Sequence, residues 1–382
     1  MNKKNVLIIA PYDDAHAIAV KDRISQLYQQ NVECTVFDIA TYPIASSINW
    51  LLDKESCEID LGISPPLAGS IGASAGKLLD KIRTDIGQHT RRVSSDSITG
   101  VWWRRPRAVE IHPEVTADEI HTFCSRTATS VSQALFSALP TYNNIDREEE
   151  ADRKPYQIWM AKKHGLMVPE TIISSDKKLI EGFANKLWKQ GKQIVYKHAA
   201  SATSLGIPTR LLTSFDIQRM GHEIKFAPTT FQERITGGTD LRIAVIGNSI
   251  FSSEWRSHEG DFDSVDIRME EGVRMWPCKC PKSIESKILQ LHKALGLTFG
   301  VYDFKVNGEG TPYFLEVNPS GQWLDMELES EHPISEAWAR LLVEGPEHRY
   351  ATSLEPLTMS HFSTVSAPYL SHRIPTEWNR VI

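Results

Sequence analysis

The chain has 382 residues, more than a single domain usually needs, so two or three domains are expected. Hydrophobic residues make up 41% of it and charged residues 24%, which is ordinary for a soluble globular protein. The formal net charge of −6 gives no sign of a polyanionic partner, so neither nucleic acid nor a membrane is expected to bind. Five cysteines without framework spacing favour free thiols in a reducing compartment, and no apolar run has membrane-spanning length, so a cytoplasmic location is expected.

The beginning of the chain predicts a small α/β domain. Residues 5–10 (NVLIIA) form the continuous apolar run typical of a buried parallel strand, and they are too few for the apolar part of a signal peptide. The apolar positions within 16–30 lie on one helix face, and further strands are expected at 33–39 and 98–103. Because a strand, a helix and a strand in succession favour parallel pairing, we expect a parallel-sheet domain over residues 1–115.

The rest of the chain predicts α+β structure. A cluster of Gly, Ser and Pro at 62–76 marks a surface loop. Helices are expected at 116–139, 156–164, 176–190 and 282–295, and strands near 166–173, at 193–197 and through much of 225–320. The expected division is a central domain over 116–230, a C-terminal domain over 231–345 and a tail over 346–382.

The most informative segment is FGVYDFKVNGEGTPYFLEVNPSGQWLD, at 299–325. Two β-type runs flank a loop rich in Asn and Gly, which predicts a hairpin. If its centre lies between Glu309 and Gly310, Asp303 is directly opposite Glu316. The apolar residues expected together on the other face are Phe304, Val306, Leu315 and Val317.

Two facing carboxylates repel each other, so this arrangement is favourable when a hard cation lies between them. Asn318 is two residues past Glu316 and therefore shares its face. Because Mg²⁺ prefers a few oxygen ligands together with phosphate oxygens, Asp303, Glu316 and Asn318 are candidate metal ligands. The alternative is the solvated face of an ordinary hairpin.

Two lysines favour the metal and phosphate interpretation. Lys154 follows an acidic run and opens a helix, whereas Lys197 ends a strand and enters a loop of small residues. Backbone N–H groups in such a loop can approach a phosphate closely while the ammonium group neutralises its charge. Taken singly, a lysine is more often an exposed surface residue.

Taken in order, the blocks between Asp146 and about Asp325 resemble those of the ATP-grasp ligases, which implies a fold that holds ATP between two α+β subdomains. ADRKPYQIWMAKKHGLMVPET resembles the first block and would supply Lys154 to the phosphates. IVYKHAASATSLGI resembles the second, with Lys197 towards the α-phosphate and the adenine edge. The mobile phosphate loop is glycine-rich in many relatives, but here it would consist of Ser201, Thr203 and their neighbours around the single Gly206.

The resemblance extends to the nucleoside and the metal. In FQERITGGTDLRIAVIG, the residues Glu233, Arg234 and Ile235 match positions that hold adenine, largely through backbone groups. Asp240 matches the acidic partner of the ribose. The block DFKVNGEGTPYFLEVNPSGQW resembles the metal block and implies the ligands Asp303, Glu316 and Asn318.

Three arginines are candidates for catalytic roles. Arg242 lies two residues after Asp240 on the same strand face, and its planar fork suits the transferring phosphate. Arg256 and Arg268 are candidates for holding a substrate carboxylate or an acyl phosphate. For these two, the alternative is surface ion pairing with Glu254, Glu259 or Asp266.

The resemblance can be narrowed. EVNPSGQW after the metal glutamate, VWWRRP at 101–106 and VDIR at 265–268 are similar to the ATP-grasp ribosomal peptide maturases, the graspetide or microviridin-type macrocyclases. This implies that ATP and Mg²⁺ activate an Asp or Glu side chain in the core of a precursor peptide that also carries a leader. A Ser, Thr or Lys side chain of the same peptide then closes an ester or amide ring. The oligomeric state stays open, although a homodimer is common in that family.

Two other functions share the same ATP residues. A ligase of the glutathione-synthase type would join a free amino acid or small amine to a carboxylate. A catalytically inactive ATP-grasp scaffold would bind a peptide or nucleotide for regulation, and the intact set of Asp303, Glu316 and Asn318 argues against it.

Overall fold

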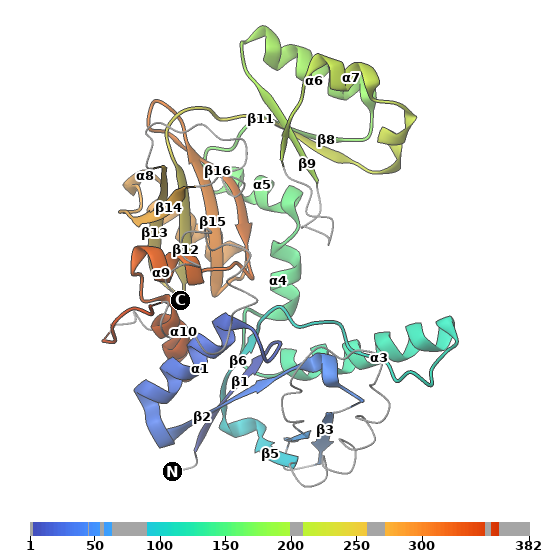
Figure 1. Cartoon of the computed structure of the whole chain (residues 1–382), viewed down its shortest axis with the longest axis vertical. Helices are drawn as coiled ribbons and strands as arrows, with labels where there is room; N and C mark the ends of the chain where they lie inside the picture. The colour runs from blue at the N-terminus through green and yellow to red at the C-terminus, as the bar shows by residue number, and fades with distance from the viewer. Residues whose placement is uncertain are drawn as a thin grey trace. The chain divides into compact units, whose positions relative to one another are not determined.

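The computed structural model describes residues 3–44, 46–53, 57–62, 90–198, 209–257, 272–347 and 353–358 (Figure 1). The chain forms two compact units: the first holds the described residues up to Asp146 and those from Pro333 onward, and the second holds those from Arg147 to His332. These units are divided differently from the four segments expected, because residues 116–146 lie with the N-terminal sheet. The expected loop at 62–76 lies outside the described residues, apart from Gly62.

The first unit contains a parallel sheet with the strand order β2-β1-β6-β7. Its strands are β1 (Lys4–Ile9), β2 (Val32–Phe37), β6 (Ile98–Trp103) and β7 (Thr141–Tyr142), of which the first three confirm expected strands. The helices α1 (Ala15–Tyr28) and α3 (Asp118–Ser137) are also close to the expected ranges. An antiparallel sheet of β3 (Ser47–Leu52), β4 (Cys57–Gly62) and β5 (Thr90–Ser94) was not expected.

Helix α10 (Ile334–Glu344) completes the first unit, although it comes near the end of the chain. It packs against α1 and β6, and its Trp338 stacks on Trp102 with the ring centroids 4.3 Å apart. Gly100 lies so close to this helix that a Cβ atom there would be 2.4 Å from the carbonyl oxygen of Leu342. The close approach explains why β6 carries a glycine at this position.

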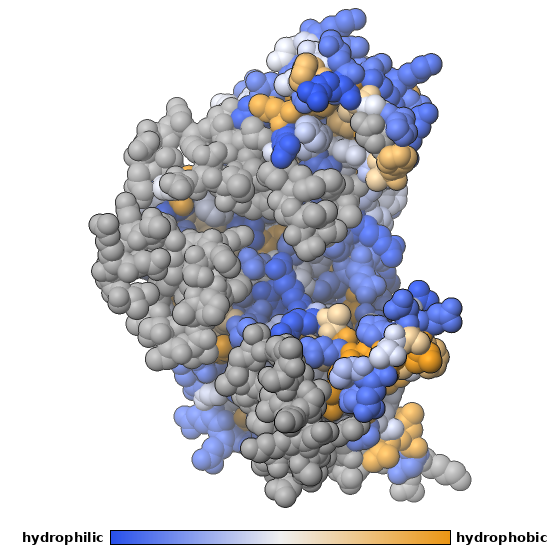
Figure 2. All heavy atoms as spheres, turned by 45° about the vertical axis from the view of Figure 1, so that its right-hand side comes forward, coloured by the Kyte–Doolittle hydropathy of each residue, from blue (hydrophilic) through white to orange (hydrophobic). Residues whose placement is uncertain are grey.

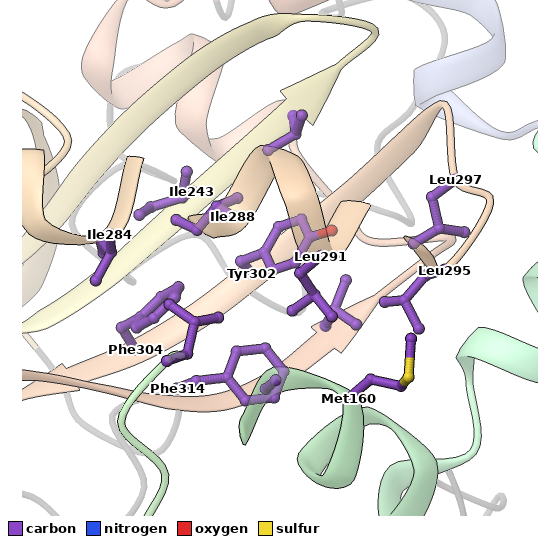
Figure 3. Close-up of a cluster of buried hydrophobic side chains, with 14 of the residues drawn as sticks. Met160, Ile243, Ile284, Ile288, Leu291, Leu295, Leu297, Tyr302, Phe304 and Phe314 are labelled. Carbon is purple, nitrogen blue, oxygen red and sulfur yellow. The ribbon is translucent and has the colours of Figure 1, made fainter. Parts of the chain in front are cut away.

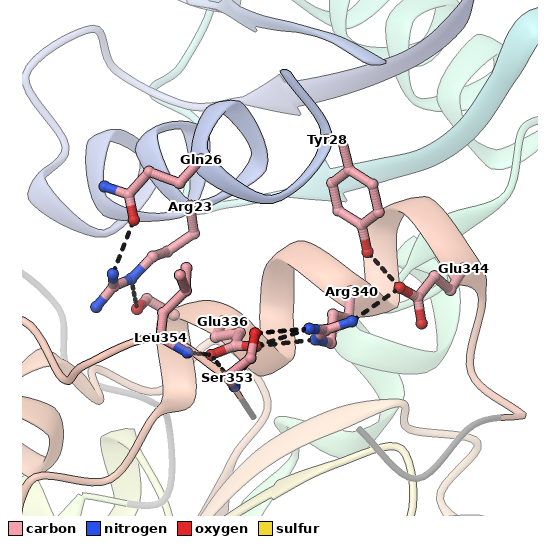
Figure 4. A network of polar contacts seen from close by, with 9 residues as sticks. Arg23, Gln26, Tyr28, Glu336, Arg340, Glu344, Ser353 and Leu354 are labelled. Atoms are coloured by element: carbon pink, nitrogen blue, oxygen red, sulfur yellow. Dashed lines mark hydrogen bonds and ion pairs between the residues drawn. The ribbon is translucent and has the colours of Figure 1, made fainter. Parts of the chain in front are cut away.

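A buried carboxylate fixes a further segment, 353–358, to α10 (Figure 4). Glu336 accepts hydrogen bonds from the backbone N–H groups of Ser353 and Leu354 and from the guanidinium group of Arg340. Burial alone would raise the pKa of Glu336, but the bonds from Leu354, Arg340 and Ser353 outweigh it and lower the pKa. A charged, fully bonded glutamate therefore anchors this segment.

The second unit contains two antiparallel sheets. One has the order β14-β13-β12-β15-β16, and the other has the order β10-β9-β11-β8. The strands of the first are β12 (Asp240–Ile246), β13 (Ser249–Ser257), β14 (Val273–Pro277), β15 (Phe299–Val306) and β16 (Pro312–Asn318). Those of the second are β8 (Thr171–Ser174), β9 (Ile194–His198), β10 (Arg210–Leu211) and β11 (Thr229–Glu233). The helices are α5 (Lys154–Lys163), α6 (Lys177–Lys189), α7 (Ser214–Arg219), α8 (Lys282–Ala294) and α9 (Leu324–Ser330), and α4 (Ile145–Ala151) spans the division between the units.

The core of the second unit lies between the five-stranded sheet and the helices α5 and α8 (Figure 3). Ile284, Ile288 and Leu291 of α8 recur at helical spacing and pack against Tyr302 and Phe304 of β15. Met160 of α5 and Phe314 of β16 belong to the same cluster. One face of this sheet is therefore apolar and covered, which leaves the alternate side chains for the opposite face.

The hairpin of β15 and β16 departs from the expected register at one place. Asp303 pairs with Glu316 as expected, but the next residue, Phe304, pairs with Phe314 because the register shifts there. Phe314 consequently occupies the buried position for which Leu315 was expected, and that expectation was wrong. An extra residue on one strand is a β-bulge, a device that redirects side chains next to functional sites.

The smaller sheet is covered on one face by α6 and α7, in which Ile180, Ala184, Leu187 and Ile217 pack against Ile194 and Phe231. No helix among those the structure describes is long and apolar enough to cross a membrane. On the face shown in Figure 2, hydrophilic surface is interrupted by small hydrophobic patches. Helix α3 contributes several exposed apolar side chains, among them Ile120 and Phe123.

Candidate functional site

A row of charged residues crosses three strands of the five-stranded sheet. Arg242 of β12 lies directly opposite Asp303 of β15, which in turn lies directly opposite Glu316 of β16. The facing pair of carboxylates expected from the sequence is therefore confirmed. Since side chains alternate along a strand, all three project from the face opposite the apolar core.

Arg242 binds the first of these carboxylates. Its Nη1 donates to Oδ1 and Oδ2 of Asp303 at 2.8 and 3.1 Å, and its Nη2 donates to the carbonyl oxygen of Gln322 at 2.9 Å. The guanidinium plane is thus held between the sheet and the segment that follows β16. Charge-assisted bonds of this kind are roughly twice as strong as neutral ones.

Lys154 binds the second carboxylate. It is the first residue of α5, where Pro155 favours helix initiation, and its Nζ donates to Oε2 of Glu316 at 2.6 Å. The two side chains are 23% and 27% exposed, so solvent can reach the pair. The structure therefore brings four of the expected site residues together: Lys154, Arg242, Asp303 and Glu316.

A second ion pair lies beside the first row and includes a residue that the sequence analysis missed. Lys305 is directly opposite Asp240, and its Nζ donates to Oδ2 of Asp240 at 2.8 Å. The lysine side chain is only 5% exposed. Its place two residues after Asp303, in a strand with one apolar face, is the sequence signal that could have identified it.

A tight turn places Asp240 and Arg242 at the start of β12. Gly238 has a φ of +59°, and a Cβ atom there would be 2.3 Å from the carbonyl oxygen of Val306. Thr239 accepts a backbone hydrogen bond from Val306 at 2.8 Å. Only glycine suits this close approach to the hairpin, which explains the pair of glycines in the sequence TGGTD.

The expected adenine-binding segment ends β11 in the smaller sheet. Its backbone N–H groups at Glu233 and Arg234 already donate to the carbonyl oxygens of Glu170 and Gln193, at 2.8 and 2.9 Å. An adenine ring could therefore bind there through carbonyl oxygens and the N–H group of Ile235. The Glu233 side chain pairs with Lys192 at 2.9 Å.

Lys197 lies in the same sheet, on β9 opposite Thr230 of β11. Its neighbour Tyr196 packs with the core under α6 and α7, so alternation directs Lys197 to the other face. Gln232 shares that face and is 2% exposed. The lysine is thus on the side of the sheet away from α6 and α7.

Arg256 is not brought to this site. Arg256 lies on β13 with its side chain paired to Glu254 and over the ring of Trp276 at 5.8 Å. Glu254 is opposite Leu241, a core residue, so Arg256 projects from the face opposite Arg242. The ion pair of Arg256 with Glu254 is the alternative that was given for this arginine from the sequence. Ser201, Thr203, Gly206 and Arg268 lie outside the described residues.

The donor set is compatible with magnesium. Asn318 is opposite Val301, two residues from Asp303, and its Oδ1 accepts from the N–H group of Ser320 at 3.1 Å, which leaves a lone pair on that oxygen. Within the described ranges, no group of three or more His, Cys, Asp or Glu side chains could hold a metal ion. Two carboxylates and one carboxamide, completed by phosphate oxygens, are the ligands Mg²⁺ takes when it binds with a nucleotide.

No protein-family model matches the chain, and no curated protein matches it either. Solved structures do match. The macrocyclase MdnC from Microcystis aeruginosa MRC, bound with precursor peptide MdnA, has a TM-score of 0.71 and 23% identity over 89% of this chain and 99% of that one.

Two further structures cover nearly the same span. A RiPP-associated ATP-grasp ligase from Chryseobacterium gregarium, in complex with ADP and a leader and core peptide, has a TM-score of 0.71 and 19% identity over 92% of this chain and 100% of that one. The ATP-grasp ligase PsnB, complexed with a phosphomimetic variant of its minimal precursor, Mg and ADP, has a TM-score of 0.64 and 18% identity over 91% and 100%. The fold implied by the sequence resemblance is thereby confirmed: the chain has the ATP-grasp fold shared by these macrocyclases and RiPP-associated ligases.

Proposed function

We propose that this protein is an ATP- and Mg²⁺-dependent ligase that closes rings in a ribosomal precursor peptide. It phosphorylates Asp or Glu side chains of the peptide and joins them to Ser or Thr hydroxyls, or to Lys amines, as ω-esters or ω-amides. The observation that carries the proposal is the row formed by Arg242, Asp303, Glu316 and Lys154. It occurs in a fold whose similar structures include ligases bound to ADP, Mg and precursor peptides.

A carboxylate must be activated before a nucleophile can displace its oxygen, because that oxygen is a poor leaving group. Transfer of the γ-phosphoryl group to the substrate carboxylate gives an acyl phosphate and ADP. The hydroxyl or amine then attacks the acyl carbon, the C–O bond to phosphate breaks, and the nucleophile loses its proton. The peptide thus loses one water per ring, and ATP ends as ADP and phosphate.

Phosphoryl transfer depends on positioning and on neutralising charge. Magnesium, when bound, supplies positive charge to the phosphates, and Asp303, Glu316 and Asn318 would hold it. Arg242 and Lys154 lie against the same carboxylates, so their charges are within reach of the phosphates at that place. Arg242 would orient the transferring group through its planar fork.

The nucleotide would extend from the metal ligands towards the smaller sheet. Lys197 would neutralise the α-phosphate, with Ser201, Thr203 and Gly206 contributing the phosphate loop. The carbonyl oxygens of Glu233 and Arg234 and the N–H group of Ile235 would bind adenine. Asp240 would accept from the ribose, a role that it would share with its pairing to Lys305. Arg268 stays a sequence-based candidate for the substrate carboxylate.

The direct experiment combines the protein with its precursor peptide, ATP and Mg²⁺. The peptide mass should fall by one water per ring, with one ADP formed for each loss. Hydroxylamine added during turnover should intercept part of the acyl phosphate, because it competes with the peptide's own nucleophile. Formation of AMP would contradict activation by γ-phosphoryl transfer.

The same experiment distinguishes the ring-closing enzyme from a ligase that uses free amino acids or small amines. An enzyme that joins a free amino acid or small amine to a carboxylate would form ADP with those compounds and would raise the substrate's mass. Turnover stimulated by free amino acids, and not by the peptide, would replace the ring-closing proposal. Absence of Mg²⁺-dependent ADP release under every condition would favour the inactive scaffold.

A further inference from the structure

Gln157, in α5, connects three parts of the second unit. Its Nε2 donates to the carbonyl oxygens of Ala151 and Val317, at 2.6 and 2.7 Å, and its Oε1 accepts from the N–H group of Val317 at 3.1 Å. The side chain is 1% exposed. Its amide therefore bonds to both the N–H and the carbonyl group of Val317, as a residue of a neighbouring strand would.

The bonded residue lies between two candidate metal ligands. Val317 separates Glu316 from Asn318, and β16 ends the sheet, with β15 on one side. On its other side the carbonyl oxygen of Met167 accepts from the N–H group of Phe314 at 2.8 Å. The pairing with β15 is interrupted by the bulge next to Asp303. Gln157 thus holds the outer edge of β16 where the inner ladder is irregular.

The same side chain lies about one helical turn from Lys154. Gln157 follows Lys154 by three residues, about one helical turn, so both face β16 from one side of α5. Lys154 binds Glu316, and Gln157 binds the next residue of the strand. A shift of α5 along β16 would therefore break both contacts at once.

We propose that Gln157 is a positioning residue that keeps Glu316, Asn318 and Lys154 in register for metal and phosphate. The inference rests on the proposed function, because it assumes that these residues bind Mg²⁺ and ATP. A purely structural role would follow from the buried backbone groups of Val317 alone, which need partners in any case. The two roles differ in whether the metal affinity changes.

The test is the affinity for Mn²⁺, used in place of Mg²⁺, in the presence of a non-hydrolysable ATP analogue. Free Mn²⁺ is measured by its electron paramagnetic resonance signal, so the result does not depend on turnover. Gln157→Met keeps the length of the side chain and removes all three hydrogen bonds. We expect its dissociation constant to rise by about 10-fold or more, as when partners of metal ligands are removed elsewhere.

The control is Ile288→Ala, which leaves a cavity in the core cluster under the same sheet but removes none of the hydrogen bonds that Gln157 makes. It should lower the unfolding midpoint while leaving the Mn²⁺ affinity within about twofold, because Ile288 lies on α8 and its truncation removes no hydrogen bond to β16. An affinity equally weakened in Ile288→Ala would show that any loss of stability has this effect, and it would overturn the positioning role.

A second variant keeps the test decisive if Gln157→Met does not fold. Gln157→Glu retains an acceptor for the Val317 N–H group but loses both donated bonds, so its Mn²⁺ affinity should also fall. Wild-type affinity in a folded Gln157 variant would overturn the inference. Lack of Mn²⁺ binding by the wild-type protein with nucleotide would instead overturn the metal assignment on which the inference rests.

Discussion

One nitrogen of Arg242 contacts both carboxylate oxygens of Asp303, the residue directly opposite it on the neighbouring strand. Lys154, from α5, donates to one carboxylate oxygen of Glu316 at 2.6 Å. Each carboxylate of the facing pair therefore has its own cation from the protein, which offsets the repulsion between them. Metal and phosphate would have to rearrange these pairs, because Mg²⁺ needs the carboxylates and the phosphates attract the cations.

Glu316→Gln should reduce ADP formation by about 100-fold or more, since loss of a ligand exceeds the 10–100-fold typical of a ligand's partner. The fold should persist, because the change also removes a like-charge contact on the hairpin. ADP release at saturating magnesium, with circular dichroism as the check on folding, measures both. Near-normal ADP formation in the folded variant would refute the metal assignment.

Lys154→Ala and Lys197→Ala should each weaken the binding of a non-hydrolysable ATP analogue by about 10-fold, equivalent to 1.4 kcal/mol. Each removes a positive charge from the proposed phosphate site. Isothermal titration calorimetry gives the dissociation constants. Lys163→Ala is a control on the same helix as Lys154, because Lys163 lies over the ring of Trp159 and not at β16. Unchanged binding in both test variants would identify the lysines as ordinary surface residues.

The central elements of the site were predictable because their signals are local. Alternation in β15 and β16 and the Asn- and Gly-rich loop were enough to place Asp303 opposite Glu316. The bulge was not predictable, because its register depends on packing: Phe314 fills a buried position that a regular hairpin would give to Leu315. Arg256 shows the same limit, since the face of β13 became known only from its pairing with β12.

The rest of the fold could not be predicted from the sequence because it depends on long-range packing. The alternation around Lys305 was visible, but its partner Asp240 lies 65 residues away, on a different strand. Helix α10 packs in the first unit, whereas the residues just before it in the sequence belong to the second. Its apolar positions recur at helical spacing and predict a helix, but not the unit that it joins. Such contacts depend on topology, which neither periodicity nor turn chemistry specifies.

Gly100→Ala tests the packing of α10. A Cβ atom at this position would meet backbone atoms of Leu342 at 2.4 to 3.0 Å, which cannot rotate away as a side chain could. We expect a loss of about 1–3 kcal/mol in the free energy of unfolding, as for other overpacked sites. Urea denaturation measures it, and wild-type stability would show that α10 does not approach β6 this closely.

The stability should also fall on acidification because of His292. This histidine is buried beside Tyr302, and burial lowers its pKa from 6.5 to about 4. Between these pH values the unfolded chain binds more protons than the folded one. The free energy of unfolding therefore has its full value above pH 6.5 and decreases as the pH falls towards 4. From pH 7 to pH 5 the loss from this group is about 2 kcal/mol. Urea denaturation of His292→Leu at both pH values should show that much less acid sensitivity, and equal sensitivity in the two proteins would refute the assignment.

Arg242→Ala should change metal binding and turnover in opposite directions. Without nucleotide, the guanidinium group competes with a metal ion for Asp303, so its removal should tighten Mn²⁺ binding several-fold. With ATP, the same change removes the group proposed to hold the transferring phosphate and should lower kcat by about 100-fold, the scale seen when one preorganised donor is lost.

Arg242→Lys keeps a charge without the planar fork, so it should retain weak Mn²⁺ binding but recover little activity. Electron paramagnetic resonance of free Mn²⁺ and ADP release measure the two effects separately. If Arg242→Ala bound Mn²⁺ no more tightly than the wild type in the absence of nucleotide, the arginine would not act as the internal counter-ion of the metal ligands.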